Sequence, residues 1–523
     1  MLFSRFQHAR ISWFTLLLIQ IAICANGQIT FQKTYDGLDM DWPQSVTQTS
    51  DGGYIFVGDQ NNFSASGLSI VKTNELGDTL WKRVYIDIGD YARPCKVLET
   101  SDGNYAIATG EGYAAYLLKI SPEGDFIWAK TYYDTLFGGT FTSFSETDDG
   151  GFICIGGIND SSFFLGSIWI VRTDPTGNIL WSKVFSGLDF YGICVAQTND
   201  GGYIMGGREE NAAGYFPSLN EAVLIRTDSL GNILWAKSYG DSLSNWQRFL
   251  HVRQLPDGGF IACGTGTVSL EGTYLVRTDS AGNVIWSYGY NTRDIKIGFD
   301  LTTDGGFIAS SYDYPDDSLL LIKIRNNGEV EWANKFTYPI YNFYTSVQQT
   351  SDGGYILLAT AQNSVDTPFH RPDFYLIKTD AAGHSGCYES PANVAYFSAP
   401  ALTSNIIPLV SSYGTQYSIT PLVAYGCKVT TLCINVAIEE LEQKSFASIY
   451  PNPFSTSAML YVPNSLSGPC SFILYDLFGR EVMQVENARD QQTIERGNLT
   501  AGIYVYRFLQ DQEIIGEGKV VIQ

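Results

Sequence analysis

The stretch Asp200-Gly-Gly-Tyr-Ile-Met-Gly206, followed by Thr227-Asp-Ser-Leu-Gly-Asn-Ile-Leu-Trp235, decides the fold because nearly the same pattern occurs seven times. The turn signal begins at Asp51, Asp102, Asp149, Asp200, Asp257, Asp304 and Asp352, and reads Asp-Gly-Asn in the second copy. Successive copies lie 47 to 57 residues apart. A near-constant period of this length is typical of solenoids, propellers and other repeat arrays.

Each unit reads as four short β-strands. Runs of β-branched and aromatic residues around the turn, such as Tyr54 to Val57, indicate strands rather than helices. In six units a Trp lies eight residues beyond the end of the third strand, usually with Gly-Asn or Gly-Asp between them. This fixed offset predicts a tight hairpin that needs a positive φ at the glycine. Four-stranded units at this period are blades of a β-propeller.

The seventh unit lacks its fourth strand, because Cys387 stands where the other units have Trp. A matching segment lies near the N-terminus, where Phe31-Gln-Lys-Thr-Tyr35 aligns with Trp235-Ala-Lys-Ser-Tyr239. We therefore expect Phe31, Lys33 and Tyr35 to supply the outer strand of the last blade and to close the ring non-covalently. The sequence thus predicts an all-β, seven-bladed propeller over residues 28–385.

Residues 1–27 have the pattern of a secretory signal peptide. Arg5 and Arg10 precede an apolar segment from Ile11 to Ile23, and Ala25-Asn-Gly27 forms a small-residue cleavage site. The apolar run is too short to span a bilayer well, and no later stretch is long enough, so no transmembrane segment is expected after signal removal. The net charge of −22 repels nucleic acid and anionic membranes, which argues against nucleic-acid binding.

Residues 386–444 lose the repeat, and no charged residue occurs from Pro391 to Cys427. Alternating stretches such as Tyr417 to Thr420 predict short strands. We expect a connector that packs partly on the propeller; a small independent β-domain is the alternative. Because exported proteins fold in an oxidising environment, we expect a disulfide among Cys387, Cys427 and Cys433. The sequence does not determine which of them pair. The cysteines within repeat strands are expected to be buried free thiols, and they are Cys154, Cys194 and Cys263.

From Ser445 the composition changes again. Ile449-Tyr-Pro-Asn-Pro-Phe454 precedes three strand-like runs, Phe472 to Val482, Leu499 to Phe508 and Gly518 to Ile522. Turns at Gly479 and Gly502 are consistent with a compact antiparallel β-sandwich over residues 445–523. With these landmarks, the segment resembles the type A C-terminal sorting domain of the Bacteroidetes type IX secretion system. An ordinary structural β-sandwich is the alternative.

The resemblance implies export through the Sec pathway to the periplasm and then across the outer membrane, with the type IX machinery as partner. In that family the domain is usually removed, and the passenger is released or attached to surface lipopolysaccharide. The residues that match the family motif are Pro451, Asn452, Pro453, Gly479, Arg480, Gly502 and Lys519. The repeats themselves resemble uncharacterised, kelch-like Asp-Gly-Gly-Tyr/Phe-Ile repeats of secreted proteins from the same bacteria, which supports a propeller and implies no activity.

Few patterns in the sequence point to chemistry. It has no nucleophile elbow, P-loop or dinucleotide fingerprint, and we predict no cofactor, catalytic residue or metal ligand. Turns such as Asp174 to Asn178 offer too few alternating oxygen ligands for an EF-type calcium loop, so we interpret them as hairpins. His251 and His370 lack metal-ligand spacing; His384-Ser-Gly-Cys387 is at most half of a zinc site, and a capping turn is our interpretation. The acidic pairs Glu209-Glu210 and Asp316-Asp317 are the candidates for a glycan hydrolase.

Ligand binding is the function that the loops favour. In a four-stranded blade the first and third turns share one face, and the variable loops share the other. Aromatic and Arg side chains on those loops offer contact area at low entropic cost. The candidate ligand-binding residues are Trp42, Tyr215, Phe216, Trp246, Tyr312, Tyr314, Arg208 and Arg371. We interpret the protein as a secreted or cell-surface recognition module for a glycan or protein; a glycan-active hydrolase and a structural or adhesive envelope protein are the alternatives.

Overall fold

The computed structural model describes residues 28–522 with internal gaps. The residues outside this description are 1–27, 37–39, 62–65, 87–93, 112–113, 134–137, 160–165, 187–188, 211–219, 241–246, 267–271, 293–296, 314–317, 339–344, 364–370, 400–401, 408, 413–414, 420–421, 425–427, 437–447, 451, 453, 462–469, 477–479, 489–490, 511–512 and 523. The predicted signal peptide lies outside the described residues. The chain divides into two compact units, a large one over Gly27–Ala437 and a small one that includes Ile438–Gln523.

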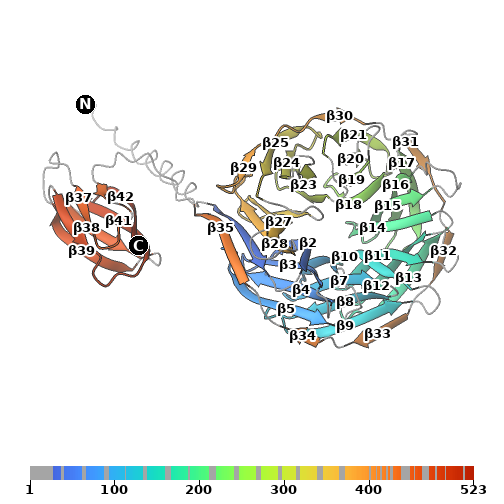
Figure 1. The fold of residues 1–523 in the computed structure, drawn as a ribbon. Coiled ribbons are helices and arrows are strands. Elements are labelled where there is room, and N and C mark those ends of the chain that lie inside the picture. The colour runs from blue at the N-terminus through green and yellow to red at the C-terminus, as the bar shows by residue number, and fades with distance from the viewer. Residues whose placement is uncertain are drawn as a thin grey trace, which may run out of the picture. The chain divides into compact units, whose positions relative to one another are not determined.

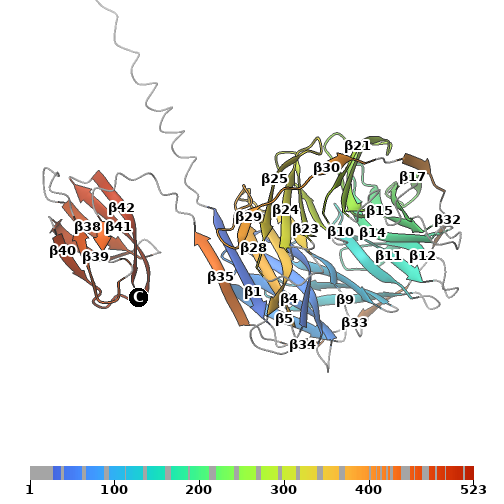
Figure 2. The ribbon, with the colours of Figure 1, turned by 45° about the horizontal axis from the view of Figure 1, so that its top comes forward.

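The described residues form strands and turns, with no helix among them, as the all-β prediction requires. It follows that the described part of the chain has no apolar helix of membrane-spanning length. The large unit contains seven antiparallel sheets, numbered here from first to seventh in chain order (Figures 1 and 2). In Figure 1 they lie around a common centre, which is a propeller-like arrangement.

Four consecutive strands build each of the first six sheets. The first sheet contains β2 (Met40–Gln48), β3 (Tyr54–Asn61), β4 (Ser66–Thr73) and β5 (Thr79–Ile86), and the second contains β6 (Pro94–Glu99), β7 (Tyr105–Glu111), β8 (Ala114–Ile120) and β9 (Phe126–Tyr133). The third contains β10 (Thr140–Glu146), β11 (Phe152–Asn159), β12 (Gly166–Thr173) and β13 (Ile179–Ser186), and the fourth contains β14 (Asp189–Gln197), β15 (Tyr203–Glu210), β16 (Asn220–Thr227) and β17 (Ile233–Gly240). The fifth contains β18 (Arg248–Gln254), β19 (Phe260–Thr265), β20 (Thr273–Thr278) and β21 (Val284–Tyr290), and the sixth contains β22 (Gly298–Leu301), β23 (Phe307–Asp313), β24 (Ser318–Ile324) and β25 (Val330–Phe336).

The seventh sheet takes its fourth strand from the N-terminal segment, as the alignment of Phe31 with Trp235 predicted. Its first three strands are β26 (Ser346–Gln349), β27 (Tyr355–Asn363) and β28 (Arg371–Thr379). Strand β1 (Ile29–Asp36) then pairs with β28 in antiparallel register, with Phe31 opposite Lys378. Phe31, Lys33 and Tyr35 are all buried, with at most 1% of the side chain exposed.

Every sheet also has a fifth strand, which the sequence analysis did not predict. These outer strands follow the seventh repeat and form a segment that we call the belt, residues 389–436. They are β29 (Glu389–Pro391), β30 (Tyr396–Ser398), β31 (Leu402–Asn405), β32 (Leu409–Ser412), β33 (Thr415–Ile419), β34 (Leu422–Ala424) and β35 (Lys428–Val436). The belt adds them to the sixth, fifth, fourth, third, second, first and seventh sheets in that order, so that it runs around the periphery (Figure 1). Pairing satisfies backbone groups that a bare edge strand would expose.

The Asp-Gly-Gly turns are held by ion pairs inside each sheet. In the fourth sheet Asp200 binds the buried guanidinium of Arg226, which comes one residue before the end of β16. The same pair recurs in all seven sheets, as Lys72–Asp51, Lys119–Asp102, Arg172–Asp149, Arg226–Asp200, Arg277–Asp257, Lys323–Asp304 and Lys378–Asp352. Partial burial opposes the charged form of Asp149, but hydrogen bonds from Arg172, Thr147 and the Gly151 amide outweigh it and lower the pKa of Asp149 to about 2.

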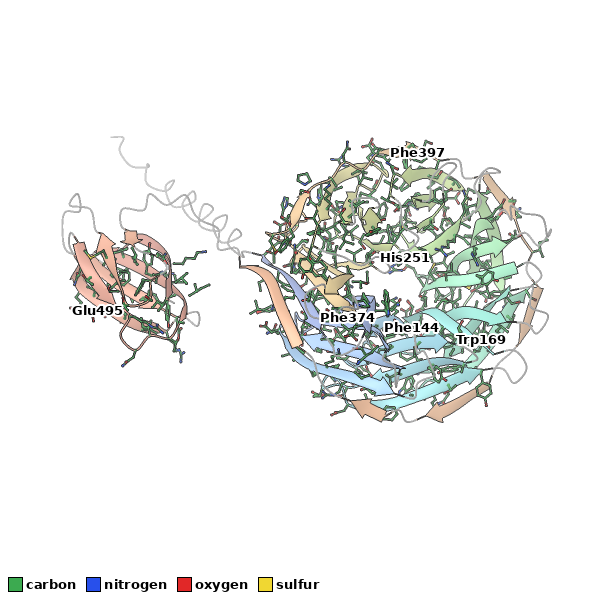
Figure 3. All side chains as sticks on the ribbon, in the orientation of Figure 1. Phe144, Trp169, His251, Phe374, Phe397 and Glu495 are labelled. Atoms are coloured by element: carbon green, nitrogen blue, oxygen red, sulfur yellow. The ribbon has the colours of Figure 1, made fainter. Side chains whose placement is uncertain are left out.

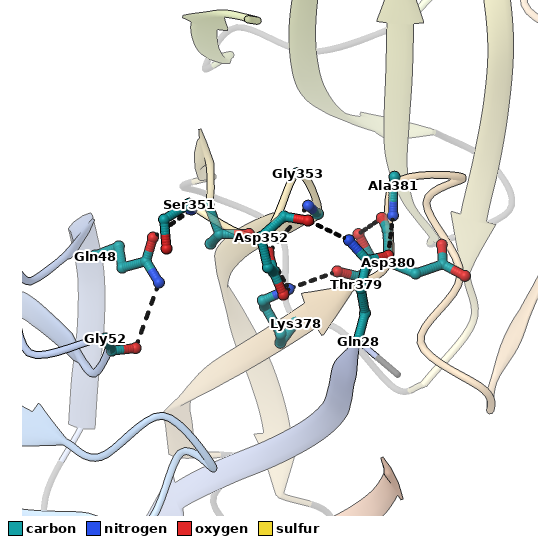
Figure 4. A network of polar contacts seen from close by, with 12 residues as sticks. Gln28, Gln48, Gly52, Ser351, Asp352, Gly353, Lys378, Thr379, Asp380 and Ala381 are labelled. Carbon is teal, nitrogen blue, oxygen red and sulfur yellow. Dashed lines mark hydrogen bonds and ion pairs between the residues drawn. The ribbon is translucent and has the colours of Figure 1, made fainter. Parts of the chain in front are cut away.

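A second set of contacts joins six of the seven turns to the next sheet. The residue before the Asp donates its backbone N–H to a Glu or Gln that ends the first strand of the neighbouring sheet. These bonds are Ser50–Glu99, Ser101–Glu146, Asp148–Gln197, Asn199–Gln254, Thr303–Gln349 and Ser351–Gln48. The bond from Ser351 to Gln48, 2.7 Å long, joins the seventh sheet to the first (Figure 4).

Aromatic residues on the fourth strands pack on the hairpin glycines of the next sheet. Gly124 has a φ of 79°, and a Cβ there would lie 3.1 Å from the Trp81 ring. The Tyr85 hydroxyl donates to Gly124 O at 2.8 Å. Strand β1 repeats both contacts on the first sheet: a Cβ on Gly77 would lie 2.7 Å from the Phe31 ring, and the Tyr35 hydroxyl donates to Gly77 O at 2.6 Å. Residues of the seventh and first sheets consequently share one core, which includes Phe31, Tyr35, Phe56, Val71 and Phe374.

The small unit consists of two sheets over one core. One sheet contains β36 (Ser448–Tyr450), β37 (Ser457–Tyr461) and β40 (Gln491–Glu495). The other contains β39 (Glu481–Ala488), β38 (Cys470–Tyr475), β41 (Gly502–Gln510) and β42 (Glu513–Ile522). Leu460 and Ile494 from the first sheet pack with Phe472, Phe508 and Val520 from the second.

Candidate functional site

The two ends of the sheets differ in composition. One end, which we call the turn side, carries the Asp-Gly-Gly turns and the Gly-Asn hairpins, whose polar groups are used in the contacts described above. The other end, which we call the loop side, carries the connections that vary between repeats. Of the predicted ligand-binding residues on those connections, Tyr215, Phe216, Trp246 and Tyr314 lie outside the described residues, and only the backbone of Arg371 is described, opposite Asn363.

Two predicted residues prove to be parts of strands. Trp42 is half-buried in β2 and pairs with Asp59 across the sheet. Tyr312 lies in β23 with 6% of its surface exposed, so its ring is not presented on a surface loop as expected. The aromatic pattern was ambiguous here because a strand that begins or ends at the loop side has the same composition as the loop itself.

Arg208 is the predicted candidate with the best-defined surroundings. It is half-buried near the loop-side end of β15, directly opposite Tyr191 of β14. The guanidinium carbon lies 4.4 Å from the centre of the Tyr191 ring, which is a cation–π contact. Arg side chains that stack on an aromatic ring are well suited to recognise carboxylates, which makes this residue a candidate for ligand binding.

Two glutamates lie side by side on the other face of the same sheet, because neighbouring residues of a strand point to opposite faces. Glu209 of β15 is directly opposite Glu221 of β16, and both are half-buried. Burial, together with the charge of Glu221, raises the pKa of Glu209. Neither carboxylate has an ion-pair partner among the described residues. Two carboxyl groups that are this close are more stable when a proton or another cation lies between them.

Gln247, which directly precedes β18 of the fifth sheet, lies close to Glu221. Its side chain is 1% exposed, and its Oε1 atom accepts no hydrogen bond in the described part of the chain. A Cβ on Gly240, at the end of β17, would lie 2.9 Å from Gln247 Oε1 and 3.3 Å from Glu221 Cδ. The missing side chain of Gly240 thus leaves room in which Gln247 and Glu221 approach one another. We call Arg208, Glu209, Glu221 and Gln247 the loop-side cluster.

Sequence reasoning found only half of this cluster. Arg208 and Glu209 were predicted from their residue types, whereas Glu221, Gln247 and Tyr191 were not. Glu221 becomes a neighbour of Glu209 only through the register of β15 and β16, which depends on where the strands resume after residues 211–219. Of the other acidic candidates, the side chain of Glu210 is not described, and Asp316 and Asp317 lie outside the described residues.

The possible metal-binding segments are used for structure. Asp174 Oδ1 accepts hydrogen bonds from the backbone amides of Thr176 and Asn178, so its hairpin needs no ion. His384 Nδ1 lies 3.2 Å from Glu389 Oε1, and this contact joins the last hairpin to the belt. His370 lies outside the described residues. In the described ranges no three acidic, His or Cys side chains converge as a metal site.

The described cysteines of the repeat strands are free thiols, and Cys387 after the repeats forms a disulfide. Cys154, Cys194 and Cys263 are buried free thiols, which confirms the prediction for the repeat strands. Cys387 is disulfide-bonded, as expected for this part of the chain. Gln32 of β1 donates a hydrogen bond to the carbonyl of Cys387, so this disulfide lies beside the strand that completes the seventh sheet.

Two of the predicted sorting-motif residues meet in the small unit. Asn452 Nδ2 donates to Lys519 O at 2.9 Å, and Asn452 Oδ1 accepts from Val521 N at 2.8 Å. Arg480 Nε lies 2.7 Å from Asp476 Oδ2, and Gly502 begins β41 opposite Ile522. The remaining motif residues, Pro451, Pro453 and Gly479, lie outside the described residues. Asn452 thereby fixes the entry segment to the last strand.

Comparison with known families identifies the small unit. Residues 448–523 match the family model described as the secretion system C-terminal sorting domain. This segment is the C-terminal sorting domain of a type IX secretion system substrate, as the sequence analysis predicted. It implies export to the cell surface or the extracellular space, and interaction with the type IX secretion machinery.

Comparison of the whole chain yields only distant likenesses. No curated protein sequence matches it. Similar solved structures include Sqt1 from Chaetomium thermophilum, with 11% identity, a TM-score of 0.37, and coverage of 66% of this chain and 87% of that one. An exo-β-1,3-galactanase from Clostridium thermocellum has 12% identity, a TM-score of 0.28, and coverage of 69% and 99%. PorZ, a surface component of the type IX secretion system of Porphyromonas gingivalis, has 9% identity, a TM-score of 0.19, and coverage of 94% and 100%. At these values the likenesses assign no activity.

Proposed function

We propose that the protein is an exported, closed seven-bladed β-propeller that binds a glycan or protein ligand on its loop side. In this proposal residues 1–27 direct Sec-dependent entry to the periplasm, and the C-terminal sorting domain directs passage across the outer membrane. The seven sheets are the blades, β1 closes the ring, and the belt adds an outer strand to each blade. Recognition, rather than catalysis, is the role of the large unit.

The difference between the two ends of the sheets carries this proposal. On the turn side the same residues recur, and their charges and hydrogen-bonding groups are paired within the scaffold. On the loop side the repeat is lost, and the fourth sheet has Arg208 stacked on Tyr191 on one face and two glutamates on the other. Binding residues are commonly placed on variable connections of a rigid scaffold.

A glycan array and a panel of surface proteins, probed with the purified chain, test the proposal. We expect Arg208→Ala to weaken binding of the identified ligand by tenfold or more, which is about the effect of losing a hot-spot Arg. Leu180→Ala is the matched control, because Leu180 is 57% exposed at the turn-side end of β13. Equal loss in both variants, or an unchanged affinity in Arg208→Ala, would contradict binding at the loop-side cluster.

A glycan hydrolase is the second candidate function, because the raised pKa of Glu209 favours its protonated form. A protonated carboxyl group directly opposite a second carboxylate is the pair that a retaining glycosidase uses as acid and nucleophile. Release of reducing sugar from a panel of polysaccharides would reveal such an activity, and Glu209→Gln should abolish it. If turnover persists in Glu209→Gln, these carboxylates are not the catalytic pair.

A further inference from the structure

Glu209 and Glu221 form an unfavourable pair unless something lies between them. Residues directly opposite in an antiparallel pair have Cβ atoms roughly 4.5–5.5 Å apart, and like charges at that separation destabilise the sheet. Both side chains are half-buried, so water screens their repulsion only in part. Arg208, the nearest cation in sequence, is stacked on Tyr191. A proton or a metal ion is therefore needed to make the arrangement stable.

Gln247 provides an independent indication of a bound cation. Its amide oxygen is buried and has no hydrogen-bond donor, although a buried acceptor without a partner is costly. The same oxygen lies over Gly240 together with the carboxyl end of Glu221. An amide oxygen would repel a carboxylate at this position. Both groups would instead be satisfied by one positive charge between them.

We propose that Glu209, Glu221 and Gln247 bind a calcium ion. Ca²⁺ takes six to eight oxygen ligands, and carboxylates and amide carbonyls are its usual protein ligands. Two carboxylates neutralise its charge, and the amide oxygen adds a third protein ligand. Mg²⁺ fits less well, because it demands near-ideal octahedral geometry and gives up its water reluctantly.

The three side chains leave coordination positions for water or for ligand hydroxyl groups. The ion would lie on the face of the sheet opposite to Arg208, because neighbouring residues of a strand point to opposite faces. It would also lower the pKa of Glu209, so a calcium site and an acid role for Glu209 exclude each other. The calcium proposal concerns binding of the ion alone and does not depend on the identity of the glycan or protein ligand.

Calorimetric titration of the chelator-treated, purified chain with CaCl₂ at pH 7 tests this site. We expect one saturable site with a dissociation constant of roughly 10⁻⁴ to 10⁻³ M, the range of extracellular calcium modules. Glu221→Gln keeps the shape of the side chain and removes its charge, and should weaken Ca²⁺ binding by about tenfold or more. Glu123→Gln, at an exposed hairpin of the second sheet, is the control and should bind Ca²⁺ as the unaltered chain does.

Two results would overturn the proposal. One is the absence of saturable heat with Ca²⁺ at millimolar concentrations. The other is equal affinity in the unaltered chain and in Glu221→Gln, with far-ultraviolet circular dichroism showing that both are folded. In that case Gln247 would turn its amide nitrogen toward Glu221 and donate a hydrogen bond to it. Gln247→Leu would then lower the melting temperature equally with and without Ca²⁺, whereas the calcium site predicts that only the unaltered chain is stabilised by the ion.

Discussion

The junction between the seventh and first sheets and the junction between the fifth and sixth sheets differ in an instructive way. The first joins segments about 300 residues apart in the chain, yet it repeats the contacts of adjacent units. Val46 N donates to Ser346 Oγ at 3.3 Å, just as Val97 N donates to Ser45 Oγ at 3.3 Å between the first and second sheets. Within the seventh sheet, Gln28 just before β1 donates to Asp352 O and accepts from Ala381 N, which fastens this strand to the turns of its own sheet (Figure 4). Chain continuity is thus unnecessary where the side chains recur.

The fifth–sixth junction joins neighbours in the chain but departs from the pattern. The position that donates a backbone N–H in the other turns is Pro256, which has none, and the position of the accepting Glu or Gln is Leu301. Other contacts replace the missing bond. His251 Nε2 donates to Ile297 O at 2.6 Å, and Arg253 Nε lies 3.7 Å from Asp300 Oδ1. Figure 3 places His251 toward the centre around which the seven sheets lie.

The two junctions teach that contact partners are kept or lost together. A Gln facing Pro256 would be left without its donor, and a backbone N–H facing Leu301 would be left without its acceptor. The six bonds of the other junctions are exposed, so water would hydrate a group that is left without its partner there. At the fifth–sixth junction both groups of the bond are absent, and the contacts of His251 and Arg253 stand in their place.

The largest expected effect comes from breaking the seventh–first junction at Phe31. Phe31→Asp puts a charge into a site that is 0% exposed, against Gly77 and Tyr54. We expect the melting temperature to fall by about ten degrees or more, and deletion of residues 28–36 to have a similar effect. Phe397→Asp, at a belt position that is 39% exposed, is the control in the same thermal melt. An unaltered melt in Phe31→Asp would contradict closure by β1.

The disulfide at Cys387 should come next. The register of β35 places Cys433 opposite Gln32, and Gln32 donates to the carbonyl of Cys387. We therefore expect peptide mapping of the unreduced protein to pair Cys387 with Cys433, which would make the belt a covalent loop around the sheets. Cys387→Ser should then lower the free energy of unfolding by about 2–4 kcal/mol in a urea titration. Reductant should destabilise the unaltered chain and leave Cys387→Ser unchanged. A Cys387–Cys427 peptide in the map would refute the pairing with Cys433.

The fifth–sixth junction should weaken in acid. Burial, with the charges of Arg253 and Lys96, lowers the pKa of His251 to about 4 despite its hydrogen bond to Ile297. The unfolded chain, with a histidine pKa of about 6.5, binds more protons between pH 6.5 and 4, so stability falls as the pH decreases through this window. We expect His251 to account for a loss on the order of 2–3 kcal/mol.

Urea titrations at pH 7 and pH 4.5 measure this effect. His251→Gln should depend less on pH than the unaltered chain, although both share the acid sensitivity of the carboxylates. Gln is chosen because its side-chain amide can donate a hydrogen bond to Ile297 O and does not titrate, so only the ionisation of the histidine is removed. Parallel pH dependences in the two proteins would show that His251 does not titrate in the folded chain as inferred.

The smallest effect should come from restoring the repeat pattern at the fifth–sixth junction. Pro256→Ser together with Leu301→Gln reintroduces the donor and the acceptor found at the other junctions. We expect the free energy of unfolding of the double variant to exceed the value obtained by adding the effects of the two single substitutions. The expected difference is about 0.5–1.5 kcal/mol, the net value of one hydrogen bond. A double-mutant cycle from urea titrations measures this coupling. Zero coupling would indicate that the two positions do not meet as Asn199 and Gln254 do.

Much of the large unit was predictable because its contacts are local or repeated. The turn at Asp200 and the hairpin at Gly231 follow from short-range turn chemistry, and the role of Phe31 follows from its match with Trp235. The ion pair of Asp200 with Arg226 was visible in the sequence, since a Lys or Arg precedes the end of every third strand, but it was not recognised. Tyr312 was misplaced because strand ends and loops share a composition.

The belt and the loop-side cluster could not be predicted in this way. Short strands such as Glu389–Pro391 and Leu422–Ala424 carry no signal that names their partner, since any free sheet edge offers the same backbone groups. The closeness of Glu209, Glu221 and Gln247 depends on strand register and on the absence of a side chain at Gly240. Neither is a property of the residues taken singly.

By itself, then, the amino-acid sequence determined the number and order of the repeats, the strand that completes the seventh sheet, and the sorting domain of the small unit. These features rest on periodic patterns and motifs that each segment carries within itself. Only the tertiary structure decided that the belt adds a fifth strand to each sheet in reverse order, and that two glutamates and a buried amide meet near Gly240. Those arrangements depend on strand pairing and packing between segments that are distant in the chain, and no single segment carries that information.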